Sequence, residues 1–406
     1  MEKSDYIVAA NTEPTRRIPG LISTKEFLVR DFTYGVLVPD KKHPLSCVSV
    51  ANSSLSIDLW IGCRWQCAYC QVQGSNQDLA FNGRMPSIPQ RRSNHSIDQI
   101  LDCLTVHPFF IPDETVISIG TASTEPFAKG PVQESTFQIM NSFIKRGLKN
   151  PFWIVTKAGI PKDRIEEIAK IVKSTKGLLI SLCWANNPKS IEPIQNNRFI
   201  NIEDAFGVGA RLVWYMRPLS SEWSGTKNEI EMMMLWVREH CKSYLNAIVP
   251  GGLRWTEGIE YGMTEAHEKS LPKLSRRDNE KDLDLQLAND ILDLSKKYLP
   301  KIPVFFKSSC AITNMLETPS ISSVQIFSRS ECKMSICPNS QRQTCVNGDI
   351  CTMKSDDIQK IADNFGIPIK VREWDPNTGK IIFNPEIDRF TYAIKQTLIN
   401  NISRKM

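Results

Sequence analysis

The stretch Ile61-Gly-Cys-Arg-Trp-Gln-Cys-Ala-Tyr-Cys70 carries three cysteines, Cys63, Cys67 and Cys70, in the spacing C-x3-C-x2-C. Three thiolates this close together can bind three irons of a 4Fe–4S cluster, because soft sulfur ligands select iron–sulfur or zinc sites. The fourth iron then has no nearby protein ligand. Such an open iron can coordinate a substrate or a cofactor, whereas a cluster with four cysteine ligands mostly transfers electrons.

Two other interpretations of the three cysteines are a zinc site and three unrelated core thiols. Zinc sites usually combine two close Cys/His couples that are separated by a longer gap. No second couple lies near residues 63–70. The spacing therefore favours an iron–sulfur cluster.

The composition is typical of a globular protein: 406 residues, 41% of them hydrophobic and 23% charged. This length allows one large barrel domain and a smaller appendage. No apolar run reaches the roughly 18 residues that a membrane helix needs, and the first residues do not resemble a secretion signal. We therefore expect a cytoplasmic protein without a membrane partner, in a reducing compartment that suits thiolate-bound iron.

The formal net charge is +6, a mild bias toward anionic partners. The basic pairs, such as Arg91-Arg92 and Arg276-Arg277, are scattered along the chain. Scattered pairs are typical of a solvated surface. Nucleic acid thus remains one candidate partner among others.

Short apolar runs alternate with amphipathic stretches along most of the chain. The expected strands are residues 55–61, 116–119, 152–155, 177–182, 211–216 and 245–249. Strands that alternate with helices predict parallel βαβ units, and hence an α/β fold with a partial (β/α)6 barrel. The active site of such a barrel lies at the carboxyl ends of the strands. Since Cys63 follows the first expected strand, we place the cysteine loop at that end.

The chain divides into three expected parts. Residues 1–50 form an N-terminal extension, residues 51–300 the barrel, and residues 301–406 a cysteine-rich region that binds a second cluster. The barrel part ends with a helix near residues 283–294. In the last part we expect a hairpin, residues 367–371 and 380–383, and a helix over 389–402.

The cysteine loop resembles that of the radical S-adenosylmethionine (SAM) enzymes, and further motifs resemble their spore photoproduct lyase-like branch. These motifs are Val116–Phe127, Thr156-Lys157, Ser181, Glu192-Pro193 followed by Arg198, and Met216-Arg-Pro218. They occur in the order of that branch and cover roughly residues 55–250. The resemblance implies a radical SAM barrel in which SAM binds the open iron.

By this resemblance, the reduced cluster would cleave SAM to methionine and a 5′-deoxyadenosyl radical, which takes a hydrogen atom from a substrate. Lys157 or Arg198 would bind the SAM carboxylate. Three further groups of residues complete the expected SAM site: Ser123, Thr124 and Glu125 at the amino group or ribose, Tyr69 near the adenine, and Ser181 on the fourth strand. A small electron donor such as flavodoxin or ferredoxin is the implied partner.

One departure from the family concerns a thiol. Spore photoproduct lyases carry a hydrogen-donating cysteine just after the second strand, and Gly120-Thr-Ala-Ser-Thr-Glu125 contains none. The nearest cysteine, Cys103, precedes that strand in an expected helix. This difference argues against thymine-dimer repair by the family mechanism and leaves the substrate open.

A second group of cysteines lies near the carboxyl end of the chain. The simplest ligand set for a second 4Fe–4S cluster is Cys310, Cys332, Cys337 and Cys345; the competing set replaces Cys310 by Cys351. Such an auxiliary cluster could exchange an electron with a substrate radical. A structural zinc site and a group of unmetallated thiols are the alternatives.

Two classes of function follow from the sequence. The first is a radical SAM enzyme that acts on a nucleic acid or nucleobase, or on a small molecule or peptide. The second is a two-cluster electron carrier or iron–sulfur scaffold without SAM. A carrier would leave Lys157, Ser181 and Arg198 without a role at the strand ends.

Overall fold

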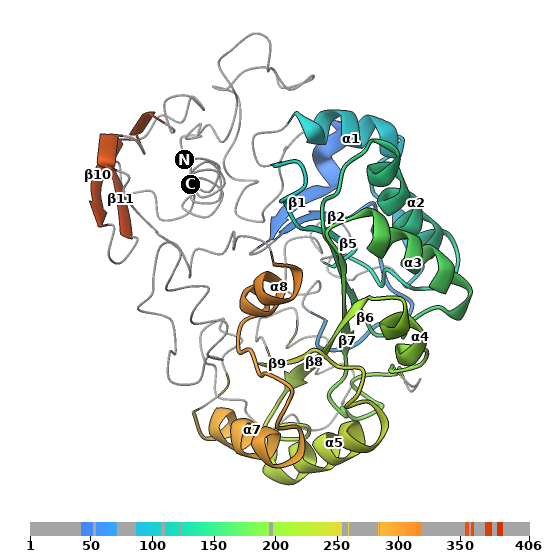
Figure 1. The fold of residues 1–406 in the computed structure, drawn as a ribbon, viewed down its shortest axis with the longest axis vertical. Coiled ribbons are helices and arrows are strands. Elements are labelled where there is room, and N and C mark those ends of the chain that lie inside the picture. The colour runs from blue at the N-terminus through green and yellow to red at the C-terminus, as the bar shows by residue number, and fades with distance from the viewer. Residues whose placement is uncertain are drawn as a thin grey trace.

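The computed structural model describes residues 42–51, 54–70, 87–106, 110–121, 123–194, 198–253, 259, 283, 285–317, 354–356, 359–360, 370–375 and 380–384. Within these residues, a seven-stranded sheet forms the centre of the fold (Figure 1). Short segments near the carboxyl end add a separate hairpin.

The sheet has the strand order β1-β2-β5-β6-β7-β8-β9. Its parallel strands are β2 (Ser54–Ile57), β5 (Ile117–Ile119), β6 (Phe152–Thr156), β7 (Leu178–Cys183), β8 (Arg211–Leu219) and β9 (Ala247–Gly252). Each parallel strand pairs with its successor in the chain, so the expected α/β architecture with six parallel strands is confirmed. The sequence analysis did not predict β1 (Val48–Ala51), which pairs antiparallel with β2 and extends the sheet.

Helices cover the two faces of the sheet unequally. One face packs against helices of the βαβ units, and α8 (Ser308–Leu316) lies on the other face (Figure 1). The helices of the barrel region are α1 (Ile97–Thr105), α2 (Pro131–Lys145), α3 (Ile165–Ser174), α4 (Ile202–Gly207), α5 (Lys227–His240) and α7 (Leu285–Tyr298). The last of these corresponds to the helix expected near residues 283–294.

Successive residues of a strand point to opposite faces of the sheet, and in this sheet both sets of residues are buried. In β7, Ile180 and Leu182 belong to the main core with the outer helices, whereas Leu179 and Cys183 belong to a second core with α8. Apart from Ser181, this strand is therefore apolar on both faces, as expected for a parallel strand with both faces covered.

The first expected strand, residues 55–61, is in fact two strands. After β2 the chain leaves the sheet at Asp58, and β3 (Trp60–Ile61) pairs antiparallel with β4 (Gln90–Arg91). Asp58 is fully buried and accepts hydrogen bonds from Ser49 and Ser123. Both carboxylate oxygens of Asp58 thus accept hydrogen bonds from side chains that are not part of the backbone pairing of the sheet. The cysteine loop thus follows β3 and not directly a strand of the sheet.

The strand ending at Met216 in the sequence analysis continues to Leu219 in the structure. An irregularity in the pairing of β8 with β9 separates Met216 from Leu219, and a cis peptide bond joins Arg217 to Pro218. The parallel pairing resumes at Leu219. Proline cannot donate a ladder hydrogen bond, which is why a sequence reading ends the strand before it.

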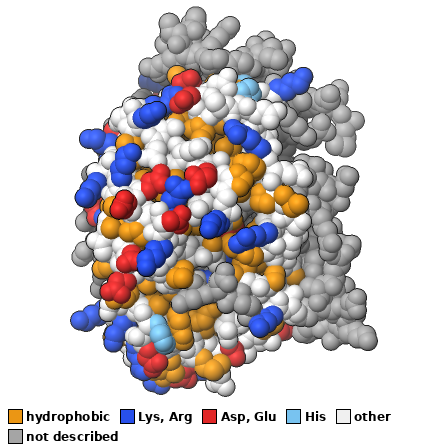
Figure 2. Space-filling model, turned by 90° about the vertical axis from the view of Figure 1, so that its right-hand side faces the viewer, with side chains coloured by type: hydrophobic (Ala, Val, Ile, Leu, Met, Phe, Trp, Pro, Cys, Tyr) orange, Lys and Arg blue, Asp and Glu red, His pale blue; other side chains and the backbone are white. Residues whose placement is uncertain are grey.

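The outer helices carry acidic and basic side chains side by side. On the face shown in Figure 2, blue and red side chains are interspersed over the described surface. Arg146 pairs with Asp98 and Asp102, and Arg164 pairs with Glu134 and Glu167. This pairing fits the solvated-surface interpretation of the basic residues on this face.

The expected hairpin near the carboxyl end is present as β10 (Lys370–Asp375) and β11 (Lys380–Asn384). The expected helix over 389–402 lies outside the described residues, and so do Cys332, Cys337, Cys345 and Cys351. None of the helices in the described segments has the length and apolar character needed to span a membrane.

Candidate active site

The cysteine loop is tied to the segment that follows β5. The Gly62 amide donates to the Ser123 carbonyl at 3.0 Å, and the Thr124 hydroxyl donates to the Gly62 carbonyl at 2.6 Å. Gly62 has a φ of 112°, which a residue with a side chain rarely adopts. These contacts place Cys63 beside the carboxyl end of β5.

Contacts within the loop fix its turns. The Gln66 side-chain amide donates to the Cys63 carbonyl at 2.5 Å, and the Cys70 amide donates to the Cys67 carbonyl at 3.0 Å. Gln66 itself has a positive φ of 47°. The loop therefore has a defined conformation before any metal is considered.

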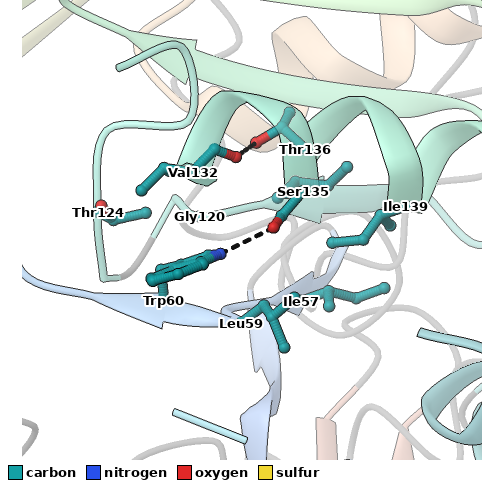
Figure 3. Close-up of a pocket in the computed structure, with 10 residues that line it drawn as sticks. Ile57, Leu59, Trp60, Gly120, Thr124, Val132, Ser135, Thr136 and Ile139 are labelled. Atoms are coloured by element: carbon teal, nitrogen blue, oxygen red, sulfur yellow. Dashed lines mark hydrogen bonds between the residues drawn. The ribbon is translucent and has the colours of Figure 1, made fainter. Parts of the chain in front are cut away.

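An indole anchors the strand before the loop to helix α2. Trp60 Nε1 donates to Ser135 Oγ at 2.9 Å, next to a small pocket (Figure 3). The pocket is lined mainly by apolar side chains, including Ile57, Val132 and Ile139. This arrangement holds β3 in place and offers little polar recognition for a ligand.

The three thiols differ in exposure. Cys67 is buried, whereas Cys63 and Cys70 are partly exposed. Burial raises the pKa of Cys63 and of Cys67 to about 12. The thiols are thus protonated unless a metal is bound, and metal binding must release their protons.

Among the described residues, no three Cys, His, Asp or Glu side chains converge closely enough to bind a single metal ion. A single zinc ion would require such convergence. In a 4Fe–4S cluster, each thiolate binds a different iron, so the sulfurs are spaced more widely. The preference for a cluster over a single ion rests on the C-x3-C-x2-C spacing of the three cysteines.

Lys157 follows β6 and points toward the cysteine loop. Its Nζ lies 3.9 Å from Cys67 Sγ, 4.4 Å from the centre of the Tyr69 ring and 3.2 Å from Glu192 Oε1. It also donates to the Tyr69 hydroxyl, which in turn donates to Glu192. The structure therefore brings together two residues of the cysteine loop, Cys67 and Tyr69, and two of the motifs singled out in the sequence, Thr156-Lys157 and Glu192-Pro193.

Glu192 is the centre of a buried ionic network. Its carboxylate pairs with Lys157 and Arg198 and accepts a hydrogen bond from Asn187 at 2.8 Å. Burial would raise the pKa of Glu192, but the two cations hold it below its usual value. Burial would lower the pKa of Lys157, but its neighbours Cys67, Tyr69, Cys183 and, to a smaller extent, Glu192 raise it well above its usual value. The network thus keeps Lys157 charged.

Two predicted SAM-site residues are engaged in the scaffold of the site. Ser123 Oγ donates to Asp58 at 2.9 Å, and its side chain is buried. Glu125 accepts from the Lys157 amide at 2.8 Å, from the Phe127 amide at 3.2 Å and from the Thr156 hydroxyl. Burial raises the pKa of Glu125 in spite of these hydrogen bonds. The Ser123 side chain thus binds Asp58 while its carbonyl accepts from Gly62 of the cysteine loop, and the Glu125 side chain holds the backbone of Lys157 in position.

Ser181 and Cys310 lie on the α8 side of the sheet. Ser181, in β7, is buried and accepts a hydrogen bond from Trp153 Nε1 at 3.0 Å. Cys310, in α8, is partly exposed and packs against the second core together with Val155. The other cysteines of the expected second site lie outside the described residues, so the structure gives the position of Cys310 but does not test the proposed ligand set.

Unpartnered polar groups gather in this region, and two of the residues that carry them, Asn187 and Trp223, were not identified in the sequence analysis. Six buried side-chain polar atoms in the described part of the chain lack a hydrogen-bond partner, and four of these belong to residues at or after the carboxyl ends of β7 and β8: Asn187 Oδ1, Arg198 Nε, Arg217 Nε and Trp223 Nε1. Buried polar atoms are normally paired. Their concentration here fits a polar ligand. Arg198 and Arg217 lie in motifs singled out in the sequence, whereas the only sequence signal of Asn187 and Trp223 is their place after predicted strands.

No protein-family model matches the chain, and no curated protein matches it. Among solved structures, the chain is similar to spore photoproduct lyases, which are radical SAM enzymes. One is a complex with dinucleoside spore photoproduct, 15% identical with a TM-score of 0.47 over 71% of this chain and 86% of that chain. Another is a tyrosine-to-phenylalanine mutant, 14% identical with a TM-score of 0.48 over 72% and 88%.

Proposed function

We propose that this chain is a radical SAM enzyme. Cys63, Cys67 and Cys70 would hold a 4Fe–4S cluster with one open iron, and SAM would bind there. When bound, the reduced cluster and SAM supply a 5′-deoxyadenosyl radical that takes a hydrogen atom from a C–H bond of the substrate. The observation that carries the proposal is the contact of Lys157 with Cys67, at 3.9 Å, within a buried ionic network.

Lys157 is the residue we assign to the SAM carboxylate. It is a mostly buried ammonium group beside the loop that would hold the cluster, and it forms an ion pair with Glu192. Arg198 lies in the same network, and its Nε has no partner, so it can donate one further hydrogen bond to a ligand. The two cations with one carboxylate leave a positive charge for an anionic group.

Positioning roles follow for the other predicted residues. Tyr69 orients Lys157 through its ring and its hydroxyl, next to the adenine position that the sequence suggests. Glu125 fixes the backbone of Lys157, and Ser123 ties the loop to Asp58. We propose a positioning role for Ser181 as well: its hydroxyl, on β7, accepts a hydrogen bond from Trp153.

The auxiliary cluster remains part of the proposal. Cys310 supplies a partly exposed thiol on the α8 side of the sheet. Together with Cys332, Cys337 and Cys345 it would bind a second 4Fe–4S cluster that exchanges electrons with the substrate, and flavodoxin or ferredoxin would reduce the first. The alternative function, a carrier or scaffold, would use both clusters without SAM.

The function can be tested by measuring 5′-deoxyadenosine. The anaerobically reduced protein should form it from SAM, and a host-cell extract should stimulate its formation. If nuclease treatment of the extract abolishes the stimulation, the substrate is a nucleic acid. If the stimulation survives nuclease and passes a small-pore filter, the substrate is a metabolite or peptide. Absence of 5′-deoxyadenosine under all of these conditions would contradict the proposed function.

A further inference from the structure

Arg217 is a third cation at the carboxyl end of the sheet, and it has no acidic partner among the described residues. Its guanidinium lies 4.2 Å from the centre of the Tyr215 ring, and its Nη2 donates a long hydrogen bond of 3.4 Å to the Pro250 carbonyl. Its Nε is buried without a partner. Lys157 and Arg198, by contrast, both pair with Glu192.

Arg217 shares its surroundings with the candidate active site. The thiol of Cys183, at the end of β7, donates to the Arg217 carbonyl at 3.4 Å. Burial raises the pKa of Cys183, and the positive charges of Lys157, Arg198 and Arg217 act in the opposite direction. Glu192 raises this pKa together with burial, so Cys183 is a buried thiol within the electrostatic range of both the ionic network and Arg217.

Because Gly251 has no side chain, the Arg217 guanidinium can occupy the space beside it. A Cβ atom on Gly251 would lie 2.4 Å from Arg217 Nε and 2.8 Å from its Cζ. Any side chain at this position of β9 would therefore displace the guanidinium. The Arg217 guanidinium, which belongs to β8, therefore lies against the backbone of β9 at Gly251 and over the ring of Tyr215.

We propose that Arg217 binds an anionic group, a phosphate or a carboxylate, of the substrate. Arg217 is partly buried and has no acidic partner in the described part of the chain. Burying a charge without a counterion is costly, and an anionic ligand would offset that cost. The planar guanidinium with its unused Nε–H suits both anions, since it can donate two parallel hydrogen bonds. Because Lys157 and Arg198 are assigned to SAM, Arg217 is available for the substrate. This assignment to the substrate rests on the proposed function.

The test uses the full chain with inorganic phosphate and acetate as probes, in calorimetric titrations at low salt. We expect Arg217→Gln to weaken binding of the preferred anion at least tenfold. Gly251→Ala should do the same while it keeps the charge, because only the end of a flexible side chain must move. Arg211→Gln is the matched control: Arg211 begins the same strand, pairs with Glu317 and should bind the probes like the parent.

The probe that binds more tightly identifies the anion as phosphate or carboxylate. Equal binding by the parent and Arg217→Gln, or no binding of either probe to the parent, would overturn the proposal. A tenfold loss of SAM affinity in cluster-loaded Arg217→Gln would overturn the assignment to the substrate. Anion binding that depends on Arg217, in a protein that neither binds nor cleaves SAM, would uphold the anion site and reject the radical SAM function.

Discussion

Replacement of Cys67 by alanine should remove about four irons per chain after anaerobic reconstitution. The parent should bind about eight, if the second site also holds a four-iron cluster. Two remaining thiolates, Cys63 and Cys70, cannot hold three corners of the cluster. Chemical analysis of iron and sulfide measures the difference.

Cys241→Ala provides the control for this substitution. Cys241 is a buried thiol at the end of α5, outside the cysteine loop. Its replacement should leave the iron content unchanged. If the parent instead binds about four irons and one zinc, the first cluster is upheld, and the second site is a structural zinc site and not an auxiliary cluster. Equal iron in Cys67→Ala and the parent would contradict the assignment of the loop.

Replacement of Glu192 by glutamine should lower the free energy of unfolding by about 3–5 kcal/mol, the usual cost of removing one partner from a buried ion pair. The side chains of Glu192 and Arg198 are only 2% and 6% exposed, and that of Lys157 is 17% exposed. Glutamine keeps the shape of the side chain but leaves two cations near one another without their carboxylate. Urea unfolding followed by circular dichroism measures the change.

Glu134→Gln is the matched control, because Glu134 also pairs with an arginine, Arg164, but is 52% exposed. Exposed pairs contribute little, so we expect a loss below about 1 kcal/mol. If the two glutamine variants lose the same free energy, the ionic network does not stabilise the site as described. A partial recovery in Glu192→Gln/Arg198→Met would support the network, since it removes one of the unpaired cations.

Much of the fold could be predicted from the sequence, because the parallel strands are short apolar runs with clear boundaries. Alternation of strands and helices gave the correct order of the six parallel strands. The break after β2 could not be predicted, since residues 55–61 are apolar enough to continue a strand. Only the buried contacts of Asp58 with Ser49 and Ser123 show why the chain leaves the sheet.

The site was partly predictable for a similar reason. Cysteine spacing identifies a local loop, and strand ends identify Lys157. The network between Tyr69, Lys157 and Glu192 joins residues far apart in the chain, so no local pattern reveals it. The same holds for Arg217, whose significance depends on its unpartnered Nε among the described residues and on the space beside Gly251. For Ser123, the position could be predicted from the sequence, but the direction of the hydroxyl, which points to Asp58, could not.

The central claim is that Cys63, Cys67 and Cys70 hold a cluster whose open iron binds SAM. The most direct measurement is the EPR spectrum of the anaerobically reduced protein with and without SAM. We expect SAM to change the cluster signal of the parent and to have no effect on Cys67→Ala. A spectrum of the reduced parent that SAM leaves unchanged would contradict the account and favour an electron carrier or an iron–sulfur scaffold.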